Sequence, residues 1–201
     1  MPIAEDHVGL TLDRIVFATD FSPSAQRAEG YALGLAKRFS STLSLTHVAR
    51  LPIASCPEPP APAFEAMRRT SVVNQERLLR EMTSAGVRTV AHTLEARNPA
   101  EAIVCFANEL RADLIVTGTT QPHGLDRAVH GSCAEEIIRH AGCPVLTVGP
   151  NAKPAPQGRF CFHTVVFATD FSSHAALQTA VALSFARESI AQIYLCHVLD
   201  H

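Results

Sequence analysis

Residues 15–22 read IVFATDFS, and residues 165–172 read VVFATDFS. Each stretch is a short apolar run that predicts a buried strand, and each ends in a serine suited to cap a helix. The similarity extends without a gap, because residues 14–48 and 164–198 are identical at 14 of 35 positions. The sequence therefore indicates a duplicated unit that begins strand, helix, strand.

The two copies differ in length. The first has room for a complete domain before the second begins, whereas the second has room only for its opening elements. We expect a complete domain over residues 1–150, a proline-rich linker over 151–160 and a partial second copy over 161–201.

Strand and helix patterns alternate along the first copy. The patterns predict strands over 14–19, 42–48, 87–94, 113–118 and 145–148, and helices over 22–39, 64–84, 98–111 and 132–140. Five prolines predict a loop over 49–63. Such alternation specifies an α/β fold, a doubly wound, five-stranded parallel sheet with helices on both faces. The strand order that we expect for this sheet is 3-2-1-4-5. The second copy adds a β-α-β fragment with strands near 164–169 and 192–198 and a helix near 172–189.

The composition is that of a globular protein, with 47% apolar residues, 18% charged residues and a formal net charge of −2. The balanced charge gives no reason to expect nucleic-acid binding, and no apolar run approaches the roughly 18 residues of a membrane span. No signal-peptide pattern opens the chain, so we expect a cytoplasmic protein. The six cysteines include no CxxC pair, and three of them sit inside apolar or strand-like segments, which indicates reduced, packed thiols. No metal site is expected.

Two strand ends in the first copy carry candidate binding residues. Asp20 follows the first strand just before a helix begins, and Gly118 ends the fourth strand before a loop that leads to Gly131-Ser132 at another helix start. Ligands of open parallel sheets sit at this edge, and a helix N-terminus suits a phosphate. An equally weighted alternative is that Asp20 and Ser132 are only helix caps.

Four motifs resemble the universal stress protein family: the opening IVFATDFS, the His47-Val48 pair, the DLIVTG strand over 113–118, and GSCAEEIIRHAGCPVL over 131–146. The resemblance covers residues 13–150 and, in part, 162–199. Members that bind ATP carry a glycine pattern G-x2-G-x9-G-(S/T). Here Gly118 and Gly131-Ser132 match its ends, whereas Gln121 replaces the middle glycine.

This resemblance implies a site for ATP with Mg²⁺. It assigns the nucleoside to Ala18, Thr19, Asp20 and Val48, and the phosphates to Gly118, Gly131, Ser132 and Cys133. Arg127, in the glycine-bearing loop, is a further candidate phosphate partner. Gln121 adds a side chain where the backbone would approach the triphosphate. A helix start also lowers the pKa of a thiol, which we expect for Cys133.

The expected function is that of an adenine-nucleotide-binding stress-response or regulatory protein without fast catalysis. The chain lacks the HxGH and SGGxDS motifs of related nucleotide-dependent enzymes, so no enzymatic activity is expected. The alternative is a dimerising stress protein that binds no nucleotide. Because the second copy has no fourth strand, its apolar first strand has an open edge, and we expect a homodimer in which the fragments are exchanged or paired.

Overall fold

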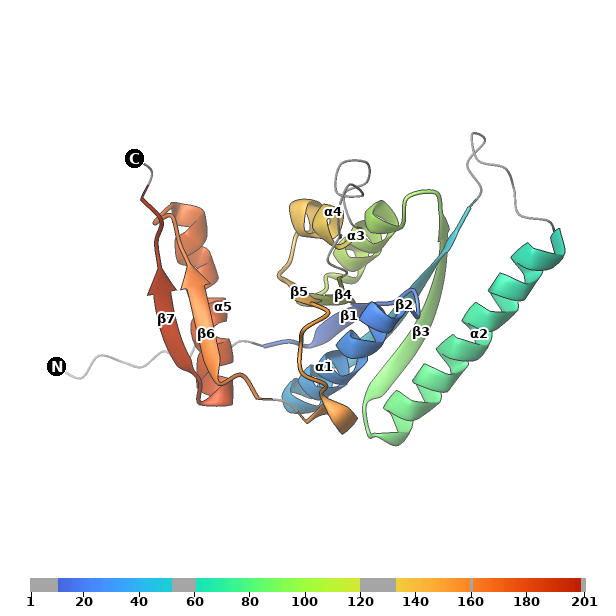
Figure 1. Cartoon of the computed structure of the whole chain (residues 1–201), viewed down its shortest axis with the longest axis horizontal. Coiled ribbons are helices and arrows are strands. Elements are labelled where there is room, and N and C mark those ends of the chain that lie inside the picture. The colour runs from blue at the N-terminus through green and yellow to red at the C-terminus, as the bar shows by residue number, and fades with distance from the viewer. Residues whose placement is uncertain (1–10, 52–60, 120–132, 160, 200–201) are drawn as a thin grey trace. The chain divides into compact units, whose positions relative to one another are not determined.

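A computed structural model describes residues 11–51, 61–119, 133–159 and 161–199 (Figure 1). These residues form two compact units, one beginning at Leu12 and ending at Phe160, the other containing Cys161–His201. The elements of the first unit are β1 (Arg14–Ala18), α1 (Pro23–Phe39), β2 (Thr42–Arg50), α2 (Ala61–Ser84), β3 (Arg88–Ala96), α3 (Pro99–Leu110), β4 (Leu114–Gly118), α4 (Cys133–His140) and β5 (Val145–Val148).

The five strands form one parallel sheet in the order β3-β2-β1-β4-β5, which confirms the predicted fold. The right-handed crossovers place α1 and α2 on one face of the sheet and α3 and α4 on the other. The central strand β1 is buried on both faces: Phe17 and Val16 are each 0% exposed. Its carboxyl end is therefore held rigidly next to the ends of β2 and β4.

Two helices begin where their capping residues predict. The Ser22 side chain accepts a hydrogen bond from the Ala25 N–H and Pro23 is the first residue of α1. Asn98 caps α3 by accepting from the N–H groups of Ala100 and Glu101. The caps fix both helix N-termini beside the carboxyl edge of the sheet.

The predicted loop over 49–63 is shorter in the structure. Strand β2 continues to Arg50 because it stays paired with β3 to that point, Arg50 lying opposite Ala96. Helix α2 begins at Ala61, earlier than predicted, since Pro62 in the first helical turn costs no hydrogen bond. The extension of β2 carries Arg50 to the carboxyl edge of the sheet.

The segment predicted as a linker packs on α1 of its own unit. Ala155 is 5% exposed, and a Cβ on Gly30 would overlap its carbonyl. The Tyr31 hydroxyl donates to the Lys153 carbonyl at 2.8 Å. We call residues 153–158, which include the 3₁₀ turn Pro156–Gly158, the strap.

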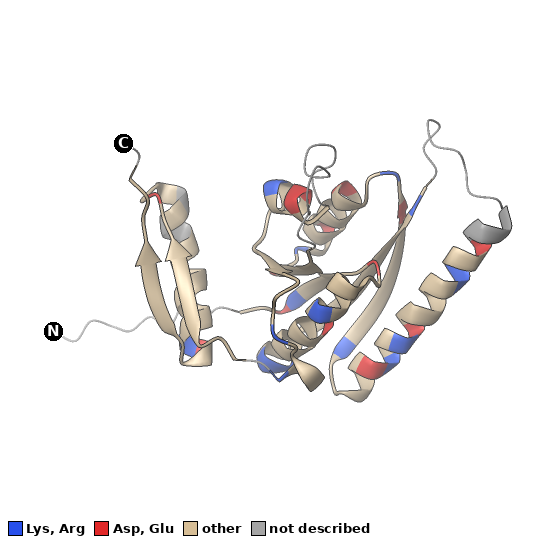
Figure 2. Ribbon diagram, viewed as in Figure 1, with Lys and Arg blue, Asp and Glu red and all other residues tan. Residues whose placement is uncertain are grey.

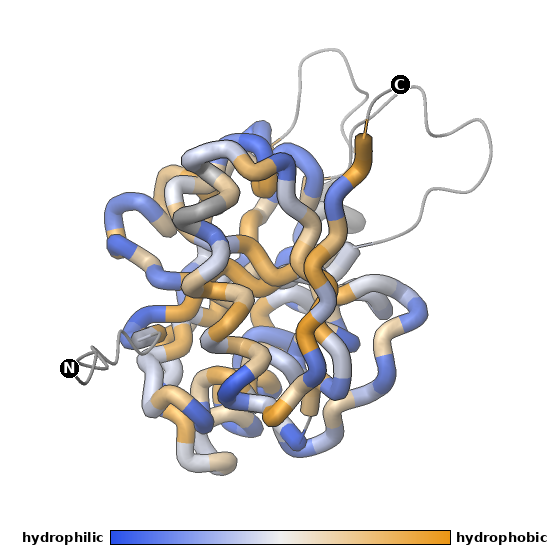
Figure 3. The backbone as a smooth tube through the Cα atoms, turned by 90° about the vertical axis from the view of Figure 1, so that its left-hand side faces the viewer, coloured by the Kyte–Doolittle hydropathy of each residue, from blue (hydrophilic) through white to orange (hydrophobic). Residues whose placement is uncertain are grey.

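The second unit contains β6 (Thr164–Ala168), α5 (Ser173–Ser189) and β7 (Gln192–Cys196). The two strands form a separate parallel sheet in the register of β1 and β2, so that Phe167 lies opposite Leu195 as Phe17 lies opposite Leu45. Apolar residues recur along β7, the strand that leads to the C-terminus (Figure 3). The local structure of the opening strand-helix-strand is thus the same in both units.

Charged residues are more frequent along α2 than in the second unit. Acidic and basic side chains alternate along α2, whereas residues 161–199 carry only three charged residues, Asp170, Arg187 and Glu188 (Figure 2). No described helix is long and apolar enough to cross a membrane. Each described cysteine is free. Cys143 is half-buried and packs against the hydrophobic core, as expected, whereas Cys105, Cys133, Cys161 and Cys196 are exposed, so the expectation of packed thiols is wrong for these four.

Candidate functional site

A cavity of about 350 Å³ lies at the carboxyl ends of β1, β2 and β4. Its lining includes all six predicted site residues that the structure describes: Ala18, Thr19, Asp20, Val48, Gly118 and Cys133. The remaining predicted residues, Arg127, Gly131 and Ser132, lie outside the described residues, as does Gln121. Residues that are up to 115 positions apart in the sequence therefore line one cavity.

The N-terminal ends of three helices meet at this cavity. Ser24 of α1, Pro99 of α3 and Cys133 of α4 all line it. The Asn98 amide donates to the Glu136 carboxylate at 2.7 Å and so links the first turns of α3 and α4. Unpaired N–H groups and the helix dipoles make such a place favourable for an anion.

Asp20 lies in a tight turn between β1 and α1. Its Oδ1 accepts a hydrogen bond from the Ser22 N–H at 3.0 Å, and the Thr19 hydroxyl accepts one from the Phe21 N–H at 3.0 Å. Phe21 has a φ of 61°, a left-handed conformation that is uncommon for a bulky residue. The helix cap is Ser22, and Asp20 supports it from an exposed position at the cavity.

His47 stabilises the same turn from the neighbouring strand. Its Nδ1 lies 2.9 Å from the Thr19 carbonyl oxygen, and its ring packs on Phe21 with 4.7 Å between the ring centroids. A carbonyl only accepts, so Nδ1 carries the proton in this bond. His47 is thus a structural residue that bonds the main chain.

Gly118 forms the floor of the cavity at the end of β4. A Cβ at this position would overlap the main chain of Ser24 and Ala25, at the start of α1. The glycine therefore allows α1 to approach the sheet closely at this point, in addition to exposing the backbone to a ligand.

The pKa of Cys133 is raised, so the predicted lowering by a helix start is wrong. Although the residue as a whole is exposed, its thiol is partly buried, and desolvation of the thiol is the main cause; the carboxylates of Glu136 and Asp20 add to the rise in pKa, and Arg50 opposes it. Cys133 is therefore a poor nucleophile and serves as part of the cavity wall.

Arg50 is a site residue that the sequence analysis missed. It lines the cavity and is its one cationic residue among the lining residues that the structure describes. The predicted end of the second strand at residue 48 left Arg50 in a loop. Continued alternation through Ala49 would have been the pattern that revealed it.

The comparisons with known proteins agree on one family. A family model described as the universal stress protein family matches residues 11–149. A Staphylococcus aureus (strain USA300) protein named as a universal stress protein is 33% identical over 148 residues, which cover 73% of this chain and 89% of that protein. A Burkholderia pseudomallei protein of the family is 29% identical with a TM-score of 0.55, over 68% of this chain and 96% of that chain.

One comparison extends beyond the first unit. A universal stress protein from Archaeoglobus fulgidus DSM 4304 matches 96% of this chain and 68% of its own, with a TM-score of 0.76 and 15% identity, which shows a shared fold. Two other universal stress proteins, each with a TM-score of 0.49, were solved with adenine nucleotides, one with cAMP and one from Archaeoglobus fulgidus with dAMP.

Proposed function

Because the chain belongs to the universal stress protein family, we propose that it binds an adenine nucleotide at the carboxyl edge of its five-stranded sheet. In this proposal the protein acts in the stress response by changing its associations when nucleotide is bound, without fast catalysis. ATP with Mg²⁺ is the proposed ligand.

One observation carries this function. The six described residues that the family resemblance assigns to a nucleotide line a single cavity on which three helix N-termini converge. That setting fits an anionic ligand, and Arg50 adds a positive charge that the sequence analysis had not identified.

Each residue contributes a distinct part of the proposed site. Asp20, exposed beside the turn, is positioned to accept hydrogen bonds from ribose hydroxyls, because Ser22 N–H occupies only its Oδ1. Gly118 and the first turn of α4 face the phosphates, and Arg50 neutralises part of their charge. When bound, Mg²⁺ would supply further neutralisation of the phosphates.

Titration calorimetry with ATP and Mg²⁺ tests this function. Asp20→Ala is expected to weaken binding at least tenfold, and Asp20→Asn, which keeps an acceptor for Ser22, to weaken it less. Asp170→Ala is the matched control, since Asp170 makes the same turn with Ser172 in the second unit but has no glycine loop. Equal loss in Asp20→Ala and Asp170→Ala, or no binding by the parent at millimolar ATP, would contradict a nucleotide site here.

A second candidate function is association through residues 161–199, which we propose are an incomplete second copy. Equivalent positions differ sharply in exposure: Leu45 is 0% exposed and Leu195 65%, while Val16 is 0% exposed and Val166 64%. In the first unit α2 and β3 lie beyond β2, and β4 lies beyond β1, whereas among the described residues the second sheet contains β6 and β7 alone. We propose that a second copy of this chain covers these positions, by pairing or exchange of the fragments.

A further inference from the structure

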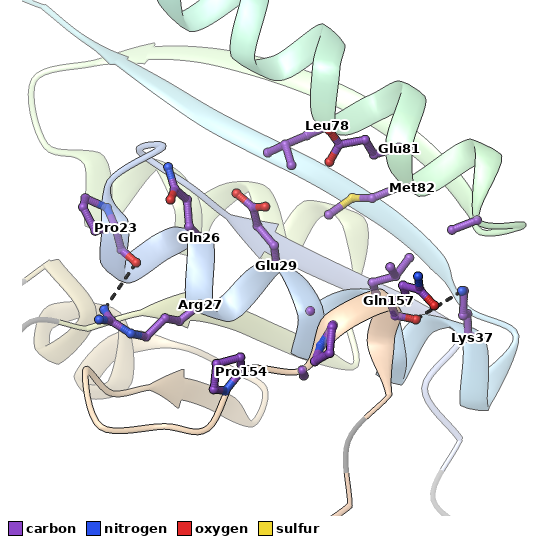
Figure 4. A pocket seen from close by; sticks show the side chains of 15 residues that line it. Pro23, Gln26, Arg27, Glu29, Lys37, Leu78, Glu81, Met82, Pro154 and Gln157 are labelled. Carbon is purple, nitrogen blue, oxygen red and sulfur yellow. Dashed lines mark hydrogen bonds between the residues drawn. The ribbon is translucent and has the colours of Figure 1, made fainter.

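A second cavity, larger than the first, lies between α1, α2 and the strap. Its volume is about 810 Å³, and its apolar wall is formed by Leu33, Leu78, Met82, Ala155 and Pro156. Figure 4 shows Glu29 projecting from α1 toward the helix that carries Leu78, Glu81 and Met82. This cavity is lined by none of the residues that form the nucleotide site.

Glu29 is the unsatisfied group in this cavity. Its side chain is 19% exposed, and its Oε1 is buried without a hydrogen-bond partner. The nearest cation is Arg77, whose Nη2 lies 3.9 Å from that oxygen, which is too far for a hydrogen bond. An acceptor left in this state costs free energy until a donor reaches it.

The other charged groups near the cavity already have partners. Arg77 Nη1 donates to both carboxylate oxygens of Glu81 at 2.9 Å. Arg27 donates to the Pro23 carbonyl and Lys37 to the Gln157 carbonyl, each at 3.4 Å (Figure 4). Lys37 also lies two helical turns from Glu29 along α1, roughly 12 Å away.

The missing donor at Glu29 then decides which ligand fits. Arg77 is engaged by Glu81, and the lining cations Arg27 and Lys37 donate to main-chain carbonyls, so none of these cations donates a hydrogen bond to Glu29. Burial raises the pKa of Glu29 to about 7, an effect that Arg77 opposes and Glu81 strengthens. A bound cation would bring the donor that Oε1 lacks and would favour the ionised carboxylate.

We propose that the cavity between α1, α2 and the strap is a binding site for a small amphiphilic amine, with the ammonium group on Glu29 and the apolar body against Leu78 and Met82. The ammonium supplies N–H donors to the buried oxygen, and the apolar wall accepts a chain of several methylene groups. This site is separate from the nucleotide site and stands without it.

Methionine methyl NMR on the full chain tests this site with n-hexylammonium as the probe. Met82 is 2% exposed in the cavity wall, whereas Met67, on the same helix, is 65% exposed and serves as an internal control. At pH 8 hexylammonium is expected to shift the Met82 resonance saturably and to leave Met67 unchanged, while hexanol and hexanoate bind at least tenfold more weakly.

Variants and pH provide independent checks. Glu29→Gln is expected to weaken hexylammonium binding at least tenfold, whereas Glu76→Gln, an exposed carboxylate of α2 paired with Arg80, should leave it unchanged. Lowering the pH from 8 to 6 should weaken binding by the parent about tenfold, as a carboxylate with a pKa near 7 becomes protonated.

Three results would overturn the amine site: no movement of Met82, hexanoate binding as well as hexylammonium, or undiminished binding by Glu29→Gln. Asp20→Ala separates this test from that of the proposed function, because it should leave the Met82 response intact whether or not ATP binds.

Discussion

The imidazole of His47 donates through Nδ1 to the carbonyl oxygen of Thr19, and His197 bonds to Thr169 in the same way at 2.7 Å. The surrounding turn is also repeated. Phe21 and Phe171 have φ values of 61° and 59°, and each ring packs on its histidine at 4.7 Å. The histidine therefore holds a strained turn in place at the start of each copy.

His47→Ala should lower the free energy of unfolding by about 1–2 kcal/mol, because it leaves the Thr19 carbonyl without its partner and removes the ring from Phe21. Urea unfolding followed by circular dichroism measures the change. His140→Ala, an exposed position in the last turn of α4, should change stability by less than about 0.5 kcal/mol. A His47→Ala protein as stable as the parent would show that this hydrogen bond contributes nothing.

Gln121→Gly should strengthen ATP binding, since it restores a glycine at the middle position of the family's phosphate pattern. We expect the dissociation constant to fall at least threefold in titration calorimetry with Mg²⁺ present. Gln157→Gly, in the strap, is the control and should leave the constant unchanged. Weaker binding by Gln121→Gly would contradict the assignment of residue 121 to the phosphate loop.

Glu29 should make the protein less stable as the pH rises. Its folded pKa of about 7 lies above its ordinary value of 4.5, so the folded state binds this proton more tightly. Stability from the protonated form is complete below about pH 4.5 and is lost as the pH rises through 7. Between pH 5 and 8 the loss is at most about 3 kcal/mol.

Glu29→Gln should abolish that loss. The free energy of unfolding of the variant should therefore increase, relative to that of the parent, from pH 5 to pH 8. Urea unfolding at both pH values measures it, with Glu76→Gln as the control. If parent and Glu29→Gln lose stability in parallel, Glu29 has an ordinary pKa in the folded state.

Gly30→Ala should detach or displace the strap, because its Cβ would overlap the Ala155 carbonyl. We expect a net destabilisation of about 1–3 kcal/mol even though alanine favours the helix. Gly149→Ala, which has nothing within 4 Å of its Cβ, is the matched control and should be nearly neutral. Equal stabilities of the two variants would mean that the strap contributes little.

Val166→Lys should weaken self-association, since it places a charge on the exposed face of β6. Size-exclusion chromatography with light scattering is expected to show a dimer for the parent and a monomer for this variant. Arg187→Lys, on the exposed side of α5, should remain a dimer. A parent protein that is monomeric at micromolar concentration would contradict the proposed pairing.

The sequence was sufficient to predict the alternation of strands and helices and the main helix caps, because these depend on local patterns: Ser22-Pro23 and Asn98-Pro99 each start a helix after an extended segment. The strand order depends on pairing between distant strands, and the structure confirms the expected order. It also predicted the six described cavity residues, which lie at the ends of predicted strands or at a helix start. Arg50 was missed, because the length of β2 depends on its pairing with a distant strand. Glu29 was missed for a similar reason: only the packing of α2 and the strap buries its carboxylate.

The close approach of α1 to Gly118 has a consequence for large-scale mutagenesis. Any side chain at this position would separate the helix from the sheet, so substitutions there would reduce cellular abundance as well as ligand affinity. A screen that scores survival alone would mark Gly118 as intolerant without distinguishing the two effects. Asp20, which is exposed, is the position where a functional score and an abundance score should diverge.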